Sequence, residues 1–519
     1  MNTIATLFYI IAALVVLVRA KPSLNPLELK GFEVLVFNYT PLGWNYTDID
    51  ASILEANFNR IEAVPGAYNS SSKDTIYLLP EFSFTTSKVI DNRTLALLLS
   101  QKVPGVSSEV VPCVVASEDP DDLMVLRLSC MARDKYVFIV ANLLEKVACQ
   151  EGEECREDGF KIYSTAIVFD KTGFIVEKYR KFHLIDEPAF DKPPNQEAAT
   201  FTTGSNITVG LFMGHDLLFS EPTTSYKARG IKHFMHVGAW KNKLPFGFST
   251  SVQHGWHNDN DDFLAVSAYV RPELGYTGNG AYFPSGSTSI IVDDGPTAFS
   301  IAYYSVDETL LEAKEQFSMD KASREIITEG IEFSKYSSVP IPASSLVSNE
   351  VRVCHGVEFC CSLTYKTIQS ADETHYQLLA FEGNRTALDG TALFPEQTCG
   401  LVACSGEDKM TCGAPMSAAN YISFTQISLV GSFSSDKVIP ITLSADIWYY
   451  PLQYLDYSAT PNGNRFDVSY TLFDGAGFPK IKTFALSSTD YTAKNGCFKS
   501  YSASLVLILM SIINSLTLL

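Results

Sequence analysis

Three residues at the ends of apolar segments raise the question of catalysis. Glu81 follows "IYLLP", Lys181 follows "VEKYR" and Gly214 follows "ITVGLFM". A carboxylate, a lysine and a thiol meeting at strand ends would form an amide-cleaving site. The carboxylate would accept the thiol proton, the thiolate would attack the carbonyl carbon, and the lysine would stabilise the oxyanion. Each residue alone is more often a solvated charge or a turn. Glycine at the third position has no side chain that can react.

The strand-like segments that precede these residues alternate along the chain with helix-like stretches. Of the helix-like stretches, 48–64 has apolar residues at helical spacing. This alternation indicates an α/β domain with a sizeable sheet. Short runs rich in β-branched and aromatic residues predict strands at 32–39, 75–81, 135–143, 164–170, 207–214, 231–237, 263–270 and 287–294.

The composition and periodicity of the sequence change after about residue 330. Residues 336–349 are rich in Ser and Pro and predict a linker or an extended loop. Residues 350–490 have short strand-like runs, many turns and little helical period, which predicts a mostly β domain. A length of 519 residues also favours two domains over one.

Ten of the cysteines fall into two even groups, four between 113 and 155 and six between 354 and 412. In an exported chain this indicates five disulfides and no free thiol. The six cysteines of the second group allow fifteen connectivities, which stay open. The spacings do not suggest zinc, and we expect neither a metal nor a cofactor. The eleven cysteines are residues 113, 130, 149, 155, 354, 360, 361, 399, 404, 412 and 497. Cleavage of an anchor signal at Asn495 would remove Cys497 and leave ten.

Pairing within each group is the simplest arrangement. We expect Cys113 to bond to Cys130 and Cys149 to Cys155. Cys360 and its neighbour Cys361 should have different partners, because a bond between adjacent residues strains the backbone.

Both ends of the chain predict export. Residues 4–18 resemble the apolar region of a signal peptide cleaved before Lys21. The apolar tail 505–519 follows a polar spacer and the small residues Asn495 and Gly496, the pattern of a lipid-anchor signal attached at Asn495. The alternative for this tail is a short membrane helix. Six glycosylation sequons agree with export and imply surface positions at Asn38, Asn45, Asn69, Asn92, Asn206 and Asn384.

The net charge of −19 argues against nucleic acid as a partner, because phosphates attract a basic surface. A buried or anchoring helix is the alternative to a signal peptide at the N-terminus. With a lipid anchor, the protein would be attached to the extracellular face of the plasma membrane; without one, it would be secreted.

The chain resembles the vanin and biotinidase branch of the nitrilase superfamily, secreted amidases that cleave pantetheine or biotinyl amides. The resemblance rests on "LLPE", "DKTGFIVEKYRKFHL", "GLFMGHDLLFSEP", "GYTGNGAYFPSGS", "VRVCHGVEFCCSLTYK" and "TCGLVACSGEDKMTCG". It implies an αββα sandwich followed by a smaller β domain. It also implies a small amide ligand, with Glu81 as general base and Lys181 as the catalytic lysine. The implied segments are a signal peptide at 1–20, a nitrilase-like domain at 21–330, a β domain at 340–495 and a removed anchor signal at 496–519.

Three departures from the family pattern are visible. Gly214 stands where the family has its nucleophilic cysteine. Phe82 follows Glu81 where the family usually has an acidic residue. Residues 258–262 are polar where the family has a mostly apolar helix near the site, which indicates an altered pocket wall or an exposed loop. The adjacent His215 is a nucleophile or base in principle, but we expect it to have a structural or surface role.

Two hypotheses follow from these departures. In the first, the protein is a pseudoenzyme that keeps the amidase fold and acts at the cell surface by binding. In the second, it is an active hydrolase of linear amides with a rebuilt site. Gly214 favours the first hypothesis, because covalent attack requires a reactive side chain.

Overall fold

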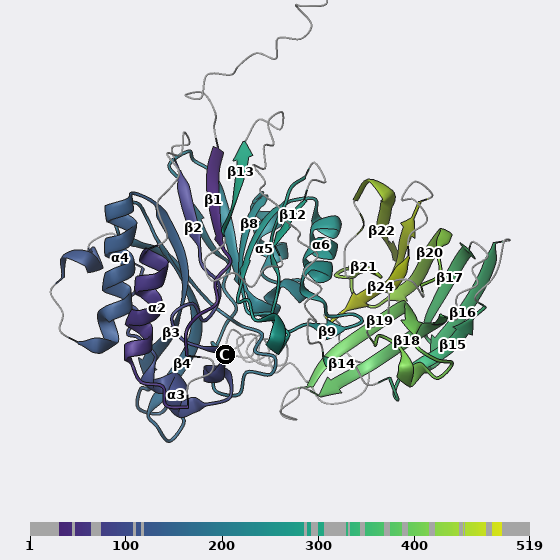
Figure 1. Cartoon of the computed structure of the whole chain (residues 1–519), viewed down its shortest axis with the longest axis horizontal. Helices are drawn as coiled ribbons and strands as arrows, with labels where there is room; N and C mark the ends of the chain where they lie inside the picture. The colour runs from purple at the N-terminus through teal and green to yellow at the C-terminus, as the bar shows by residue number, and fades with distance from the viewer. Residues whose placement is uncertain are drawn as a thin grey trace, which may run out of the picture.

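The computed structural model describes the chain from residue 31 to residue 489 (Figure 1). The expected signal peptide, Asn45, Asn69, Asn495, Cys497 and the expected anchor tail lie outside the described residues. The gaps within this range are 44–46, 64–73, 107–109, 116–118, 285–287, 292–298, 306–328, 331–332, 343–347, 368–373, 387–392, 415–420, 446–449, 451 and 474–479.

Two six-stranded sheets form the N-terminal half of the molecule. The first has the order β13 (Phe299–Ser305), β1 (Gly31–Phe37), β2 (Thr75–Leu78), β3 (Phe138–Ala148), β4 (Phe160–Phe169) and β5 (Ile175–Arg180). The second has the order β12 (Thr288–Ile291), β11 (Asn279–Tyr282), β10 (Phe263–Ala268), β8 (His233–Gly238), β7 (Thr208–Met213) and β6 (Ala199–Thr202). The central pairs β1–β2–β3 and β7–β8–β10 are parallel.

Helices cover the outer faces of both sheets, so the layers are helix, sheet, sheet and helix (Figure 1). The alternation along β3 shows why: Phe138 and Val140 belong to the core between the sheets, whereas Ile139 and Ala141 face the helices. Strands buried on both faces read as continuous apolar runs. The helices are α2 (Ser52–Glu62), α3 (Arg93–Leu98) and α4 (Leu123–Lys135) on the first sheet, and α5 (Thr223–Ala228) and α6 (Ser249–Asn260) on the second.

The C-terminal half is a β domain of two five-stranded antiparallel sheets. One has the order β15 (Ser337–Ile341), β18 (His375–Thr386), β19 (Leu393–Cys404), β24 (Ile481–Ser488) and β21 (Ile439–Ser444). The other has the order β16 (Asn349–His355), β17 (Phe359–Thr367), β20 (Phe424–Phe433), β23 (Arg465–Leu472) and β22 (Leu455–Asn462). A two-stranded pair, β9 (Lys243–Leu244) and β14 (Glu329–Gly330), completes the set.

The linker expected at 336–349 is wrong over its first part. Residues 337–341 form β15, which pairs with β18 at the edge of a sheet. Pro340 lies within this strand, and proline is tolerated there because one side of an edge strand makes no ladder hydrogen bonds.

Five disulfides join the ten described cysteines. The expected bonds Cys113–Cys130 and Cys149–Cys155 are confirmed. The other three are Cys354–Cys360, Cys361–Cys399 and Cys404–Cys412, so the adjacent Cys360 and Cys361 have different partners as expected. The bond from Cys361 on β17 to Cys399 on β19 connects the two sheets of the β domain.

The two halves meet where α6 packs against β21. Gly255 lies against the carbonyl oxygen of Pro440, and Ser251 Oγ donates a hydrogen bond of 2.6 Å to the carbonyl oxygen of Thr442. Lys437 Nζ lies 3.0 Å from Asp259 Oδ2. The polar segment 258–262 therefore ends a helix and contributes an ion pair between the halves, so neither an exposed loop nor a pocket wall describes it.

Among the described residues, no helix has the length and apolar character needed to cross a membrane.

Candidate active site

The structure brings Glu81, Lys181 and Gly214 together from three strand ends. Lys181 Nζ lies 3.0 Å from Glu81 Oε1 and 3.2 Å from Glu81 Oε2. Both side chains are buried, with Lys181 only 1% exposed. Glu81 and Lys181 are therefore in direct contact. This contact also accounts for the burial of both charges, since an unpaired charge in this setting would be strongly disfavoured.

Neighbouring strands hold Glu81 in place through a short chain of hydrogen bonds. Ser164 on β4 donates its hydroxyl to Glu81 Oε1 at 2.8 Å, and Asn142 on β3 donates Nδ2 to that hydroxyl oxygen at 3.0 Å. Asn142 Oδ1 accepts the backbone N–H of Phe82. Phe82 is buried and has a φ of 60°, so the backbone turns sharply directly after Glu81.

Gly214 begins a short 3₁₀ turn, Gly214–Leu218, directly after β7, and its φ is +50°. A Cβ built on this residue would lie 2.5 Å from Lys181 Nζ and would overlap Lys181 Cε. The lysine thus occupies the space beside the missing side chain. The absence of a side chain at Gly214 therefore does not deepen the pocket at this position, because Lys181 fills the space.

Two further side chains fix the turn. His236 on β8 donates Nε2–H to the carbonyl oxygen of Gly214 at 2.8 Å. Asp216 accepts the hydroxyl of Tyr179 at 2.7 Å and lies 2.6 Å from His183 Nδ1. Burial is the main reason that the pKa of His236 falls to about 4, so its ring is neutral and retains one N–H for this bond.

Sequence analysis missed a second carboxylate at this site. Glu187 Oε1 lies 2.6 Å from Lys181 Nζ, so one ammonium serves two buried carboxylates. Burial raises the pKa of Glu187 to about 8, Lys181 opposes this rise, and the neighbouring Glu81 adds to it. Burial alone would lower the pKa of Lys181, but Glu187 and Glu81 together raise it above its ordinary value. The lysine is therefore an ammonium at neutral pH.

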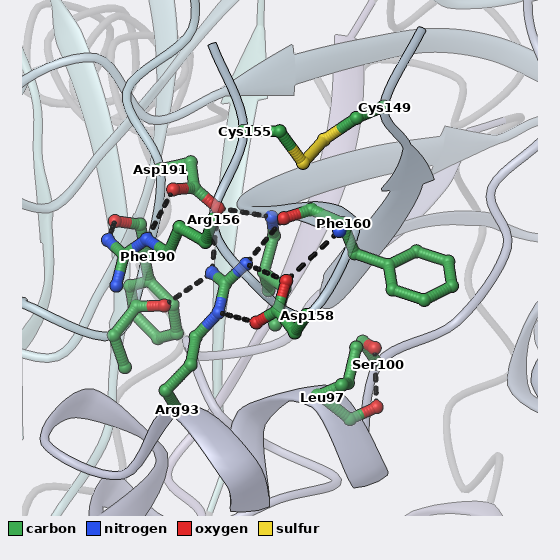
Figure 2. Close-up of polar contacts among 12 residues, drawn as sticks. Arg93, Leu97, Ser100, Cys149, Cys155, Arg156, Asp158, Phe160, Phe190 and Asp191 are labelled. Carbon is green, nitrogen blue, oxygen red and sulfur yellow. Dashed lines mark hydrogen bonds and ion pairs between the residues drawn. A yellow bond between two sulfur atoms is a disulfide. The ribbon is translucent and has the colours of Figure 1, made fainter. Parts of the chain in front are cut away.

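An arginine network holds the segment that follows Glu187 (Figure 2). Arg93 on α3 donates to the carbonyl oxygen of Ala189 at 2.8 Å and pairs with Asp191 at 2.6 Å and Asp158 at 2.7 Å. Arg156 donates to the carbonyl oxygens of residues 188 and 190 at 3.0 and 2.9 Å. Since Arg156 directly follows Cys155, the Cys149–Cys155 disulfide tethers the same network. These bonds hold the backbone of the residues directly after Glu187.

A cavity of about 400 Å³ lies beside this cluster, between the two halves of the molecule. Glu187, His215 and Trp240 line it from the N-terminal half, and Arg385 and Glu396 from the β domain. The ring of His215 packs 5.0 Å from that of Trp240, and burial lowers its pKa well below the ordinary value. His215 is therefore a neutral part of the cavity wall.

The sequon positions differ in exposure. Asn92, Asn206 and Asn384 are exposed, which is compatible with a glycan at each. Asn38 is only 1% exposed, and its Oδ1 accepts a hydrogen bond of 2.8 Å from Asn279 Nδ2. The surface position expected for Asn38 is wrong, because a sequon is a local pattern that does not report burial.

The N-terminal half of the chain, with its four layers, is similar to the carbon-nitrogen hydrolases. The Carbon-nitrogen hydrolase family matches residues 70–260, and the Vanin C-terminal domain family matches residues 327–493. The chain belongs to the vanin and biotinidase branch of the carbon-nitrogen hydrolases, as its sequence motifs predicted.

Several curated proteins of this branch are similar to the chain. A biotinidase of Takifugu rubripes is 29% identical over 358 residues, which cover 64% of this chain and 70% of that protein. Vanin-like protein 1 of Drosophila melanogaster is 28% identical, with 60% of each protein covered. A pantetheinase of Bos taurus is 26% identical over 485 residues, or 88% of each protein.

Solved structures of the nitrilase superfamily are also similar. An amidase from Nesterenkonia is 19% identical, with 53% of this chain and 90% of that chain covered and a TM-score of 0.36. A Saccharomyces cerevisiae member of branch 10 of the superfamily is 16% identical, with 53% and 89% covered and a TM-score of 0.36.

Proposed function

We propose that this protein is an extracellular, catalytically silent member of the vanin branch that acts by binding a small ligand. Gly214 carries the proposal. In the family pattern its position belongs to the nucleophilic cysteine, and covalent attack on an amide carbonyl requires a side chain there. Removing the nucleophile from a serine protease lowers the rate by about 10⁶-fold. A loss of that size would leave no useful turnover.

The surroundings of Gly214 support the same proposal. All ten described cysteines are in disulfides, so none of them supplies a thiolate. Lys181 fills the space beside Gly214 and is held as an ammonium by Glu81 and Glu187. A protonated amine has no lone pair and cannot replace the thiolate as nucleophile.

The alternative is an active hydrolase of linear amides with a rebuilt site. The observation that favours it is the intact cluster of Glu81, Lys181 and Glu187, which retains a proton acceptor and an oxyanion partner. Water steered directly by this cluster would be the nucleophile in that case.

Turnover decides between the two. The protein, expressed from the full chain, is incubated with pantetheine and with a biotinyl amide, alongside the Bos taurus pantetheinase as a positive control. We expect no turnover above the buffer rate, and no thiol in the denatured, unreduced protein. Turnover that survives removal of contaminating enzymes would establish the active-hydrolase alternative. Because the relatives are named pantetheinase and biotinidase, these amides are also the first ligands to test for binding.

We also propose that the protein lies on the outer face of the plasma membrane, attached through a lipid anchor at Asn495. Five disulfides support an oxidising compartment. Treatment of intact expressing cells with a phosphatidylinositol-specific phospholipase should release the protein. Retention on the cells would favour a membrane helix, and accumulation in the medium without the enzyme would favour secretion.

A further inference from the structure

The cavity between the two halves contains a buried carboxylate oxygen without a partner. Glu187 is 6% exposed and lines the cavity. Its Oε1 is bonded to Lys181, but its Oε2 has no hydrogen-bond partner among the described residues. A buried acceptor left in this state costs free energy, so such an atom facing a cavity points to a ligand that donates a hydrogen bond.

When Glu187 is ionised, the charges around the cavity are unbalanced toward the negative. Its walls and the adjoining cluster hold five carboxylates against four cations. Lys243 is paired with Asp186 at 2.8 Å, and Arg385 with Glu396 at 2.5 Å. Lys181 alone serves both Glu81 and Glu187. The carboxylates are Asp91, Asp186, Glu187, Glu396 and Glu81, and the cations are Lys241, Lys243, Arg385 and Lys181.

The remaining walls suit a cation with a short apolar body. Trp240, Phe246, Tyr276 and Phe394 line the cavity, together with Ile439 and Ile441 of β21. Aromatic faces attract ammonium groups, and aliphatic side chains accommodate an alkyl stem.

We propose that this cavity binds a small primary organic ammonium, with Glu187 Oε2 accepting one of its N–H donors. The ligand supplies the positive charge that the cluster lacks once Glu187 is ionised, and it satisfies the unpartnered oxygen. An anion is disfavoured in this cavity, because Lys243 and Arg385 are already paired with carboxylates. A neutral amide donates a hydrogen bond to Glu187 but leaves the charge unbalanced. The inference rests on the proposed ligand-binding role and narrows it to one class of ligand.

Three matched probes test this proposal by isothermal titration calorimetry at pH 9, where Glu187 is ionised, on protein expressed from the full chain. Propylamine, propionamide and propionate are similar in size and differ in charge. We expect propylamine to bind at least about tenfold more tightly than either of the others, the advantage of a charge-assisted hydrogen bond over a neutral one. Equal or tighter binding of propionamide would overturn the proposal, and so would failure of propylamine to bind.

The pH dependence gives an independent readout. The charged groups that act on Glu187 are Lys181 and Glu81 at the strand ends and Asp216 in the turn after β7. Burial raises the pKa of Glu187 to about 8. It must lose its proton to hold an ammonium. Propylamine affinity should therefore rise about tenfold between pH 7 and pH 9, with nearly one proton released per ligand at pH 7. An affinity that is flat over this range would contradict the assignment to Glu187.

Glu187→Gln keeps the shape of the side chain and removes its charge. We expect it to weaken propylamine binding about tenfold or more and to abolish proton release. Glu151→Gln, at an exposed carboxylate that does not line the cavity, is the matched control and should bind like the parent protein. Unchanged binding in Glu187→Gln would overturn the proposal. None of these outcomes bears on amide turnover, so the proposed loss of catalysis is tested separately.

Discussion

The ammonium of Lys181 occupies the space that a side chain on Gly214 would require. A Cβ on Gly214 would lie 2.5 Å from Lys181 Nζ, and the φ of +50° at this glycine disfavours any other residue. Restoring a side chain at position 214 therefore has two separate costs, one in the backbone and one in the displacement of Lys181 from Glu81.

These two costs can be separated with a pair of alanine variants. Gly214→Ala should lower the free energy of unfolding by more than the ~1–3 kcal/mol that a left-handed backbone conformation costs a non-glycine residue. Gly230→Ala is the control, because Gly230 has a φ of +73° but no atom within 4 Å of the added Cβ. Urea unfolding of both variants gives the comparison. Equal losses would mean that Lys181 moves aside freely.

The Lys181 ion pairs should contribute to stability and not to catalysis. Lys181→Met leaves Glu81 and Glu187 buried without a cation, and breaking a buried pair in this way costs ~3–5 kcal/mol. We expect a lower melting temperature and no change in the absent amidase rate. The loss should be smaller at pH 5 than at pH 8, because the pKa of Glu187 is about 8 and this carboxyl is protonated at pH 5.

The control for this variant is Lys102→Met, which removes an exposed ion pair with Asp119. Exposed pairs contribute ~0–1 kcal/mol, so its melting temperature should hardly change. A real amide turnover that disappears in Lys181→Met would instead show that the protein is an enzyme.

How much the sequence could predict depended on whether a pattern is local. Strand periodicity placed Glu81, Lys181 and Gly214 after the strands β2, β5 and β7. These strands belong to two different sheets, and it is the packing of the sheets that brings the three residues together. The even number of cysteines in each group predicted the disulfide count, because pairing within a group depends only on residues that are close in the sequence. These predictions required no knowledge of side-chain packing.

The features that escaped prediction depend on contacts between distant residues. Glu187 lies in a loop without periodicity, and its carboxylate meets Lys181 only in the folded structure. The spacing of six residues after Lys181 was the one available signal, and it does not separate a buried carboxylate from a solvated one. The Lys181 side chain fills the space at Gly214 because of the rotamer that it adopts, and no sequence pattern reports a rotamer.

Glu187 should make stability depend on pH. Its pKa is about 8 in the folded protein against 4.5 ordinarily, so the carboxyl stays protonated on folding while the unfolded chain ionises. This contribution to stability is complete below pH 4.5 and is lost as the pH rises toward 8. Glu187→Gln has no such titration. Its free energy of unfolding relative to the parent should therefore be higher at pH 8 than at pH 5, with a change on the order of a few kcal/mol.

Thermal unfolding of both proteins at pH 5, 6.5 and 8 gives this difference directly. Glu151→Gln, whose carboxyl is exposed, should run parallel to the parent protein. A Glu187→Gln difference that does not change with pH would show that Glu187 is already ionised in the folded protein.

The contact between Gly255 on α6 and the carbonyl oxygen of Pro440 on β21 should control how the two halves unfold. Replacing glycine by alanine inside a helix normally stabilises it by ~0.5–1 kcal/mol. Here the added methyl would overlap the Pro440 carbonyl oxygen and approach Ile439 Cγ2 at 2.8 Å. We expect Gly255→Ala to destabilise the protein by ~1–3 kcal/mol instead, because overpacking forces the backbones apart.

Calorimetry of Gly255→Ala should show two separated transitions where the parent shows a single or more closely spaced one. Ser251→Ala is the comparison, because it removes one hydrogen bond of the same interface, to Thr442, without adding volume. Its loss should be near ~1 kcal/mol. Since Ile439 also lines the cavity, Gly255→Ala should weaken propylamine binding while Ser251→Ala leaves it nearly unchanged. A stabilised Gly255→Ala with normal binding would mean that α6 and β21 are not tightly packed in solution.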